Sequence, residues 1–391
     1  MKILIIHNAY KFKGGEDSVV EQEYDLLKSN GVKVDILKFD NDELPKNKLK
    51  LFASSIYNTV SYKRLHRKLS DIKPDVIHIH NLFYAASPSI LYAAKELKVP
   101  VIMTVHNYRL VCNAATLLRD GAVCEKCIQK TFPLSGIKNA CFQESKLKSA
   151  QLSLITGLHK IKGTWKDKVS KYIFLTDFAK QKISSSSLNL DLKKCTVKPN
   201  FVSDSGNPEI LSRSNSYLFV GRLSKEKGVD ILIEAFKTLP YHLNIIGTGP
   251  LEETIQAASR GVSNISFLGL KDKKEVIHYM KTSKALVFPS IWYEGMPMTI
   301  LEAYSCGTPV ISSDIDNINE IILNNKTGLH FKTGSHKSLS ETIRRFEKID
   351  NSYLYSGARK EYEEKYTSQK NYELLINIYE ETINDYKNAA N

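Results

Sequence analysis

Two glutamates eight residues apart give the strongest chemical signal in the sequence. Glu294 and Glu302 lie in Ser290-Ile-Trp-Tyr-Glu-Gly-Met-Pro-Met-Thr-Ile-Leu-Glu-Ala303. This stretch follows an apolar run typical of a buried strand and precedes a helical pattern that ends at Cys306-Gly307, and Pro297 suits the first helical turn. Carboxylates accept hydrogen bonds from sugar hydroxyls, and free N–H groups at a helix start attract phosphate. The arrangement suits a sugar nucleotide, although such glutamate pairs also occur by chance on surface helices.

Two cations after an earlier strand are suited to neutralising a diphosphate. Arg222 and Lys227 lie in Phe219-Val-Gly-Arg-Leu-Ser-Lys-Glu-Lys-Gly228. Arginine offers a planar fork to phosphate, and lysine offers a point charge. Glycines follow two other strands, at Gly14-Gly15 and at Gly247 in Gly-Thr-Gly-Pro250. Each glycine turn allows close approach of a phosphate, and each is equally compatible with an ordinary tight turn.

One histidine and four cysteines complete the set of reactive side chains. His106 ends an expected strand in Thr104-Val-His-Asn-Tyr108, where a lone histidine is more often structural than catalytic. The four cysteines have the spacing C-x11-C-x2-C-x13-C, whose centre is typical of half a zinc site. Four thiolates would make a closed structural site, whereas buried thiols or a redox pair explain the spacing as well. They are Cys112, Cys124, Cys127 and Cys141.

Alternating strand and helix patterns must position these residues. Such alternation predicts an α/β fold with parallel sheets, which bind ligands where the strands end. A turn-rich stretch over 198–208 separates two alternating sets and predicts two Rossmann-like domains that face each other across a crevice. Strands are expected over 2–6, 32–37, 76–80, 101–105 and 171–176, and again over 217–220, 243–246, 265–268, 285–288 and 309–312.

Length, composition and charge narrow the class of protein. The 391 residues exceed what one core usually supports, and the 42% apolar share is that of a globular chain, neither disordered nor membrane-spanning. The sequence begins with a strand pattern rather than a secretory leader, so we expect a cytoplasmic protein. Residues 1–200 carry 33 Lys and Arg against 18 Asp and Glu, whereas the remainder is nearly neutral. This excess, with basic amphipathic patterns over 45–69 and 146–171, indicates either an anionic partner or merely solvated helix faces.

The combined motifs resemble those of the retaining glycosyltransferases of family 4, whose fold is GT-B. Glu294 to Glu302 is similar to the family's E-x7-E motif, and 221–228 is similar to Gly-Arg-Leu-x-x-x-Lys-Gly. Gly14-Gly15 resembles the loop over the donor phosphate and the acceptor. His106 matches the family's Thr-x-His-Asp stretch, but Asn107 replaces the aspartate, which puts in doubt any role that depends on a His–Asp pair.

The resemblance implies a role for each of these residues. Glu294, His106, Arg222 and Lys227 would be catalytic: Glu294 holds donor-sugar hydroxyls, His106 lies near the reacting carbon, and the two cations neutralise the leaving diphosphate without a metal. No metal or other cofactor is therefore expected in catalysis, and any zinc would be structural. Donor binding would involve Gly14, Gly15, Gly247, Gly295, Met296, Pro297, Met298, Thr299 and, at the ribose, Glu302.

These expectations define domains and partners. Residues 1–200 would form the acceptor-side domain, with a cysteine-bearing insertion at about 108–145; 201–365 would bind the nucleotide sugar, and a helix over 366–391 would pack back on the first domain. The acceptor would be a glycan or lipid-linked hydroxyl in polysaccharide or lipopolysaccharide assembly, reached from an anionic membrane surface, with no nucleic acid partner. The alternatives are a sugar-nucleotide epimerase or phosphorylase of the same fold, and a non-catalytic membrane-binding or nucleic-acid-binding protein.

Overall fold

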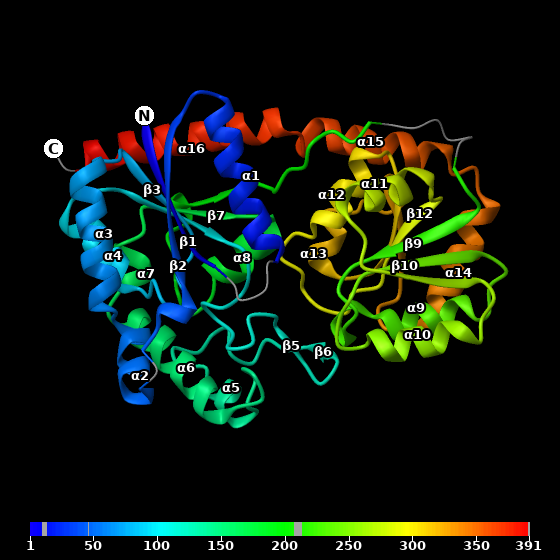
Figure 1. Cartoon of the computed structure of the whole chain (residues 1–391), viewed down its shortest axis with the longest axis horizontal. Coiled ribbons are helices and arrows are strands. Elements are labelled where there is room, and N and C mark those ends of the chain that lie inside the picture. The colour runs from blue at the N-terminus through cyan, green and yellow to red at the C-terminus, as the bar shows by residue number, and fades with distance from the viewer. Residues whose placement is uncertain (10–13, 46, 207–212, 390–391) are drawn as a thin grey trace. The chain divides into compact units, whose positions relative to one another are not determined.

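The computed structural model describes residues 1–9, 14–45, 47–206 and 213–389 (Figure 1). The chain divides into two compact units. The first contains Met1–Leu117, Glu125–Pro199 and Asn371–Asn391, and the second contains Leu118–Cys124 and Asn200–Lys370. Each unit is built around its own six-stranded sheet, so the α/β prediction is confirmed.

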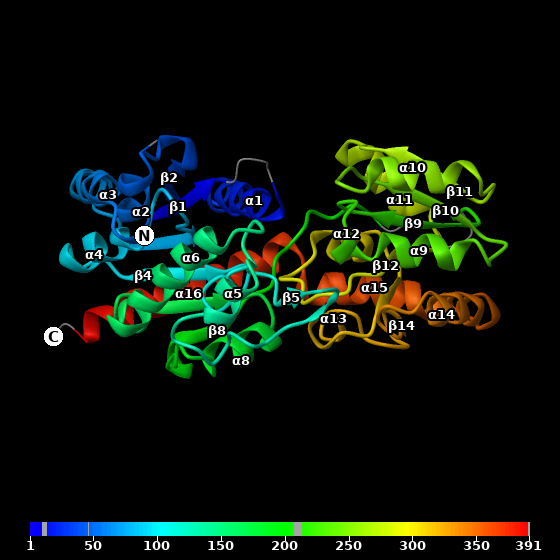
Figure 2. The ribbon, with the colours of Figure 1, turned by 90° about the horizontal axis from the view of Figure 1, so that it is seen from below.

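The sheet of the first unit is wholly parallel, with the order β2-β1-β3-β4-β7-β8. Helices lie on both of its faces (Figures 1 and 2), which is why β3 and β4 are buried along their whole length. β2 lies on one side of β1 and the later strands lie on the other, so the strand order reverses between β1 and β3. Parallel sheets commonly bind ligands at the carboxyl ends of the two strands at such a reversal. The strands are β1 (Lys2–Ala9), β2 (Lys33–Asp40), β3 (Val76–Asn81), β4 (Val101–Val105), β7 (Lys171–Phe174) and β8 (Cys195–Val197).

Helices and one inserted segment complete the first unit. The main helices are α1 (Gly15–Ser29), α2 (Lys48–Ile56), α3 (Thr59–Ile72), α4 (Ser89–Glu96), α8 (Asp177–Ser184) and α16 (Ser368–Asn388), with a short 3-10 turn, η1 (Asn41–Glu43), after β2 and another, η2 (Leu192–Lys194), before β8. The segment after β4 holds the antiparallel pair β5 (Leu118–Arg119) and β6 (Ala122–Val123), then α5 (Leu134–Lys138), α6 (Lys146–Ile161) and α7 (Thr164–Asp167). The pair β5–β6 is grouped with the second unit.

The sheet of the second unit has the order β11-β10-β9-β12-β13-β14, again wholly parallel. In chain order this is 3-2-1-4-5-6, the doubly wound arrangement of nucleotide-binding domains, and its direction reverses between β9 and β12. The strands are β9 (Ser216–Val220), β10 (His242–Ile246), β11 (Ile265–Gly269), β12 (Ala285–Phe288), β13 (Val310–Ser313) and β14 (Gly328–Phe331). The helices are η4 (Lys225–Lys227), α9 (Val229–Phe236), α10 (Glu252–Arg260), α11 (Lys273–Thr282), α12 (Met298–Ser305), α13 (Asp316–Asn319), α14 (His336–Lys348) and α15 (Ser352–Lys365).

The last helix contributes to the core of the first unit. Leu375, Ile378 and Tyr379 of α16 pack with Ile3 and Ile5 of β1 in one buried cluster. Burying apolar area of this kind stabilises the fold by about 25 cal/mol per Å². The helix begins at Ser368, two residues after the start expected from the sequence. The first unit is thus built from both ends of the chain.

A buried ion pair lies beneath the same helix. The Lys198 ammonium donates to Oε1 of Glu23 at 2.7 Å and to Oδ1 of Asn371 at 3.2 Å, and Lys198 and Glu23 are almost completely buried. Burial opposes ionisation of Glu23, but Lys198 and two neighbouring histidines outweigh it and hold the pKa of Glu23 well below its ordinary value. Asn371 of α16 also donates to the carbonyl of Pro199. The pair and Asn371 therefore link α1 and α16 to the residues around Lys198, where the segment Glu125–Pro199 ends.

Replacing Lys198 tests this anchor. We expect Lys198→Met to destabilise the first unit by about 3–5 kcal/mol, because Glu23 is left buried without its cation. The depressed pKa of Glu23 stabilises the native state above the unfolded-state pKa of about 4.3, and that contribution is lost as the pH falls through the native value. The variant should therefore also lose part of the acid dependence of its stability, measured by urea unfolding from pH 7 down to about pH 2, below the unfolded-state pKa.

The exposed neighbour Lys193 provides the control. Lys193→Met should leave the unfolding midpoint unchanged, since surface substitutions have small effects. Equal stability losses in the two variants would contradict a specific role for the Lys198–Glu23 pair.

Candidate functional site

In the second unit, Glu294 lies in the loop between β12 and α12. One of its carboxylate oxygens, Oε1, accepts hydrogen bonds from Lys227 Nζ at 2.6 Å, Ser290 Oγ at 2.7 Å and Trp292 Nε1 at 2.8 Å. The residue is 6% exposed. Three donors on one oxygen fix the carboxylate, and among the described residues none donates to Oε2. The second oxygen is therefore oriented and available to a ligand hydroxyl.

The pairing of Glu294 with Lys227 joins two motifs that lie 67 residues apart. Lys227 follows β9 and Glu294 follows β12, and these strands are neighbours at the point where the sheet order reverses. The Lys227 ammonium also lies 5.7 Å from the centroid of the Trp292 ring. The sequence led us to expect Lys227 at a diphosphate and Glu294 at a sugar, and the structure adds a direct contact between them. One sugar phosphate is small enough to meet both groups.

Three further contacts hold these loops together. The N–H of Ile291 donates to the carbonyl of Glu226 at 3.0 Å, and Asn317 Nδ2 of α13 donates to the carbonyl of Glu294 at 2.5 Å. Gly228 has φ +67°, and a Cβ there would lie 2.1 Å from the carbonyl oxygen of Pro289. Only glycine allows this close approach without a shift. Neither Asn317 nor the packing role of Gly228 was recognised from the sequence.

The glycine turn after β10 brings a third loop to the same strand ends. Gly247 has φ +146°, and a Cβ there would lie 1.9 Å from the carbonyl oxygen of Gly221. The Gly221 N–H donates to Ile246, and the Leu223 N–H donates to Thr248. This packing fixes the backbone on either side of Arg222, whose side chain is exposed. Arg222 can therefore reach a ligand outside the sheet.

Helix α12 presents the second glutamate of the motif. Pro297 is the N-cap and Met298 is the first helical residue, so the expectation that Pro297 lies within the first turn is wrong by one position. Gly295 and Met296 lie in the loop before this N-cap, and the N–H groups of Met298 and Thr299 lie at the helix start, where intrahelical acceptors are missing. Glu302, one turn further, has Oε1 3.7 Å from Lys273 Nζ at the start of α11. Burial raises the pKa of Glu302, against the effect of Lys273.

Met296 has a structural contact of its own. Its sulfur lies 3.2 Å from the N–H of Asn200, and its carbonyl lies 3.5 Å from Asn200 Nδ2. The side chain is almost completely buried. Met296 therefore fixes the loop through its side chain, and any contact with a donor would have to come from its backbone.

In the first unit, His106 and the glycine pair lie at the same edge of the sheet. His106 follows β4, and Gly14 is the N-cap of α1 after β1. The Gly14 N–H donates to Oδ2 of Asp17 at 2.8 Å, and the other Asp17 oxygen lies 2.8 Å from Nε2 of His7. A Cβ at Gly15 would meet no atom within 4 Å, so this glycine faces open space. The Asp17 carboxylate thus caps the start of α1.

His106 contacts another histidine rather than an acidic residue. Its Nε2 lies 3.0 Å from Nδ1 of His80, and the two rings stack with centroids 5.2 Å apart. Burial lowers the pKa of His106 well below its ordinary value, and the neighbouring His80 lowers it further. Asn107, which replaces the family's aspartate, accepts the N–H of Arg109 through Oδ1. His106 is therefore neutral at physiological pH.

The cysteines are divided between environments. Cys112 and Cys127 are buried, Cys124 and Cys141 are partly exposed, and Cys124 belongs to the second unit. Within the described part of the chain, the ligand atoms of His, Cys, Asp and Glu converge in one group, Glu23, His78 and His80, which contains no cysteine. The zinc site expected from the C-x2-C spacing stays a prediction.

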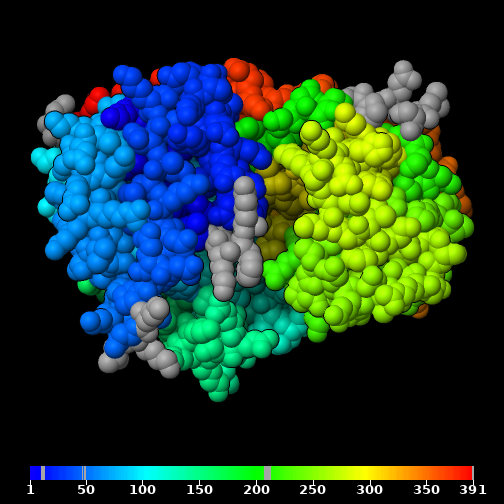
Figure 3. Space-filling view, viewed as in Figure 1, coloured from blue at the N-terminus to red at the C-terminus, as the bar shows by residue number. Residues whose placement is uncertain are grey.

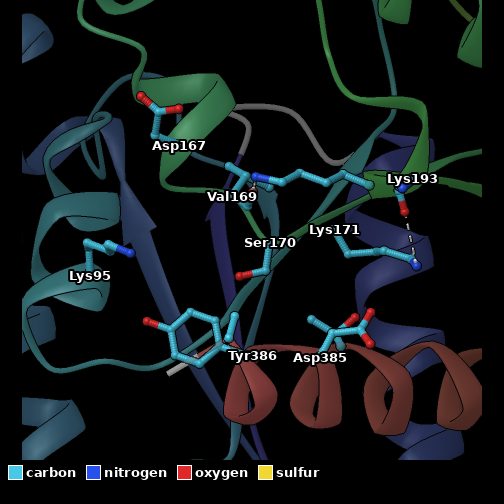
Figure 4. Close-up of a pocket in the computed structure, with 11 residues that line it drawn as sticks. Lys95, Asp167, Val169, Ser170, Lys171, Lys193, Asp385 and Tyr386 are labelled. Atoms are coloured by element: carbon cyan, nitrogen blue, oxygen red, sulfur yellow. Dashed lines mark hydrogen bonds between the residues drawn. The ribbon is translucent and has the colours of Figure 1, made fainter. Parts of the chain in front are cut away.

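A pocket of about 310 Å³ in the first unit lies away from these residues (Figure 4). Lys171, which begins β7, and Tyr386 of α16 are among its lining residues, and Lys95 points toward it from the end of α4. The pocket is therefore at the amino ends of the strands. Because parallel sheets bind their ligands at the carboxyl ends, this pocket is not the candidate site.

Known proteins resemble the chain along almost its whole length. Residues 13–132 match the family described as Glycosyltransferase Family 4, and residues 203–378 match the family described as Glycosyl transferases group 1. An uncharacterized glycosyltransferase of Methanocaldococcus jannaschii is 28% identical over 97% of this chain and 98% of its own. The O-antigen chain mannosyltransferase C of Escherichia coli is 28% identical over 42% of this chain and 46% of its own.

A solved structure shares the fold. The Anabaena protein HepE in complex with UDP superposes with a TM-score of 0.68 over 97% of this chain and all of that chain, at 14% identity. At this identity the likeness concerns the arrangement of the backbone.

Replacing Gly247 tests the geometry of the glycine turn. Gly247→Ala should destabilise the second unit by about 2 kcal/mol or more, because a Cβ would strain the backbone and collide with the Gly221 carbonyl. Gly261→Ala is the matched control, since Gly261 has ordinary φ and open space around its Cβ position. Thermal unfolding of both variants measures the difference; equal melting temperatures would contradict the close approach.

Proposed function

We propose, from the premise that the chain belongs to glycosyltransferase family 4, that it transfers a sugar with retention from a nucleoside diphosphate sugar to a hydroxyl acceptor. The chain is a glycosyltransferase of the two-domain α/β GT-B type. The observation that carries the donor proposal is the contact between Lys227 and Glu294 at the reversal point of the second sheet. HepE, which shares this fold, is bound to UDP, and that supports a nucleoside diphosphate donor.

Each group has a defined task in this proposal. Oε2 of Glu294, oriented by the three donors on Oε1, accepts hydroxyls of the donor sugar, and Glu302 accepts those of the ribose. Arg222 and Lys227 neutralise the diphosphate as it leaves, so that no metal ion is needed for this purpose. The N–H groups at the start of α12 add to this stabilisation.

The transfer itself requires little covalent chemistry from the protein. The acceptor oxygen attacks the anomeric carbon on the face from which the phosphate leaves, the bond to the phosphate oxygen breaks, and that oxygen takes the acceptor's proton. Catalysis then rests on positioning and on electrostatic stabilisation of the leaving group. His106 lies at the carboxyl end of the first unit's sheet and contacts the sugar.

The acceptor class is proposed from the relatives. One of them acts on an O-antigen chain, and this supports a glycan or lipid-linked acceptor in cell-surface polysaccharide or lipopolysaccharide assembly. An epimerase of the same fold would convert its nucleotide sugar without an acceptor. A non-catalytic binding protein has no need for the oriented carboxylate of Glu294. Neither alternative is favoured.

We also propose that the first unit docks on an anionic membrane surface from the cytoplasmic side. Helices α5 and α6 pack together, and Figure 3 shows their segment as a bulge on the surface of this unit. Leu134 is 66% exposed and Leu147 is 74% exposed, with Lys138, Lys146 and Lys148 around them. Apolar side chains surrounded by lysines suit an interface with anionic lipid. Lys46, in the other basic stretch, lies outside the described residues.

None of the helices in the part of the chain that the structure describes is both long and apolar enough to cross a membrane.

Removal of the Glu294 carboxylate tests the donor proposal. Glu294→Ala should lower the rate of sugar transfer, or of the slower hydrolysis of the nucleotide sugar, at least 100-fold. This is about the effect of losing a main electrostatic contact, and the fold should be retained. The measurement is product formation across a panel of donors, with circular dichroism as the check on folding. Glu253→Ala, which alters an exposed glutamate of α10, should leave the rate unchanged. An active Glu294→Ala enzyme would overturn the assignment.

Flotation with vesicles tests the membrane proposal. The protein should float with vesicles that contain phosphatidylglycerol and less with phosphatidylcholine alone, because both charge and apolar contact contribute. The double variant Leu134→Gln, Leu147→Gln should float less. Leu270→Gln removes an equally exposed leucine from the second unit and should have no effect. Flotation that ignores lipid charge or is unchanged in the double variant would argue against docking through α5 and α6.

A further inference from the structure

We propose that His80 and Glu23 position His106, holding it in the tautomer that carries its proton on Nε2. The Nδ1 atom of His106 is then a fixed acceptor for a hydroxyl of the sugar or the acceptor. The identity of that hydroxyl rests on the proposed function, whereas the tautomer depends only on contacts within the first unit. Neither His80 nor Glu23 lies in the motifs that the sequence analysis singled out.

The contacts form a chain that begins at a buried ion pair. Lys198 Nζ is 2.7 Å from Oε1 of Glu23, and the other oxygen of Glu23, Oε2, is 3.4 Å from Nε2 of His80. Nδ1 of His80 is in turn 3.0 Å from Nε2 of His106. Glu23, His80 and Lys198 are buried, and His106 is partly exposed. This series of contacts therefore ends at His106, whose imidazole is more exposed than that of His80.

The chemistry of each group fixes the proton positions. A carboxylate only accepts hydrogen bonds, so the His80 nitrogen that faces Glu23 carries the proton. With that proton on Nε2 of His80, its Nδ1 is left as the acceptor, and Nε2 of His106 donates to it. The remaining nitrogen of His106, Nδ1, holds a lone pair. The Lys198 ammonium keeps Glu23 ionised and thereby keeps this order of protons in place.

A neighbouring histidine shows that the arrangement is specific. His78 lies beside His80, with ring centroids 4.2 Å apart, but its two nitrogens contact the Tyr379 hydroxyl at 2.8 Å and Thr104 Oγ1 at 2.7 Å. Oε1 of Glu23 already contacts the Lys198 ammonium. Both nitrogens of His78 thus have protein partners, whereas Oε2 of Glu23 and Nε2 of His80 face each other at 3.4 Å.

Two substitutions of His80 separate positioning from packing. In His80→Asn, the amide oxygen can replace Nδ1 as the acceptor for His106, whereas the reach to Glu23 is lost. In His80→Gln, the longer amide can reach Glu23, but no acceptor remains where Nδ1 was. We expect His80→Gln to lower kcat about 10- to 100-fold, the usual effect of losing a supporting contact of this kind, with the donor KM within twofold. His80→Asn should retain most of the activity.

The tautomer is read directly from ¹⁵N chemical shifts of the imidazole, with the His106 signal assigned by its loss in His106→Gln. Wild type and His80→Asn should show a protonated Nε2 and an unprotonated Nδ1, and His80→Gln should show a mixture of tautomers. Tyr379→Phe is the control for structural damage: it removes a contact of His78, so stability should fall while the His106 signal and kcat stay unchanged.

The outcomes distinguish this proposal from the proposed function. A wild-type His106 protonated on Nδ1, or a His80→Gln protein with a wild-type tautomer and kcat, would overturn the positioning role. Failure of the wild-type protein to transfer sugar from any donor would reject the proposed function, and the chemical shifts would still decide the tautomer.

Discussion

Parallel strands all end at one edge of their sheet, and the second unit depends on which strands are neighbours there. β9 pairs with β12, although more than 60 residues separate them, because β10 and β11 extend the sheet to one side and β12 returns to the other. This pairing brings the Lys227 ammonium to the Glu294 carboxylate. The glycines at 228 and 247 then serve the same purpose, since each removes a side chain that would keep neighbouring loops apart.

The two units use charge in opposite ways. At the strand ends of the second unit, Arg222 is exposed, and the donors to Glu294 from the described residues all lie on Oε1, so Arg222 and Oε2 of Glu294 are left for a ligand. In the first unit the charges of Lys198 and Glu23 are buried and paired, and they contact Asn371 and the histidines beside them rather than a ligand. One unit is suited to neutralising a leaving group, and the other is suited to orienting neutral hydrogen-bonding groups.

The sequence predicted the alternation of strands and helices because the spacing of apolar residues and the residues that form turns can both be recognised within a short stretch of sequence. It did not predict β14, whose four residues Gly328–Phe331 include a histidine and give little apolar signal. Lys227 and Glu294 were found because they belong to motifs, but their contact depends on strand order, which no local pattern records. Asn317, Lys273 and Glu23 were missed for the same reason. Glu23 has the same appearance in sequence as Glu16 and Glu21 of the same helix, which are only partly buried, and only the fold shows that Glu23 is fully buried.

The place of α16 has a consequence for biosynthesis. The core of the first unit contains Leu375, Ile378 and Tyr379, and the Lys198 ammonium contacts Asn371. These residues leave the ribosome after the whole of Asn200–Lys370. The second unit therefore has nearly all of its chain available first, whereas the first unit, although begun earlier, must wait for the synthesis of α16 to complete its core. Domain folding in this protein is thus out of step with the usual N-to-C order of synthesis.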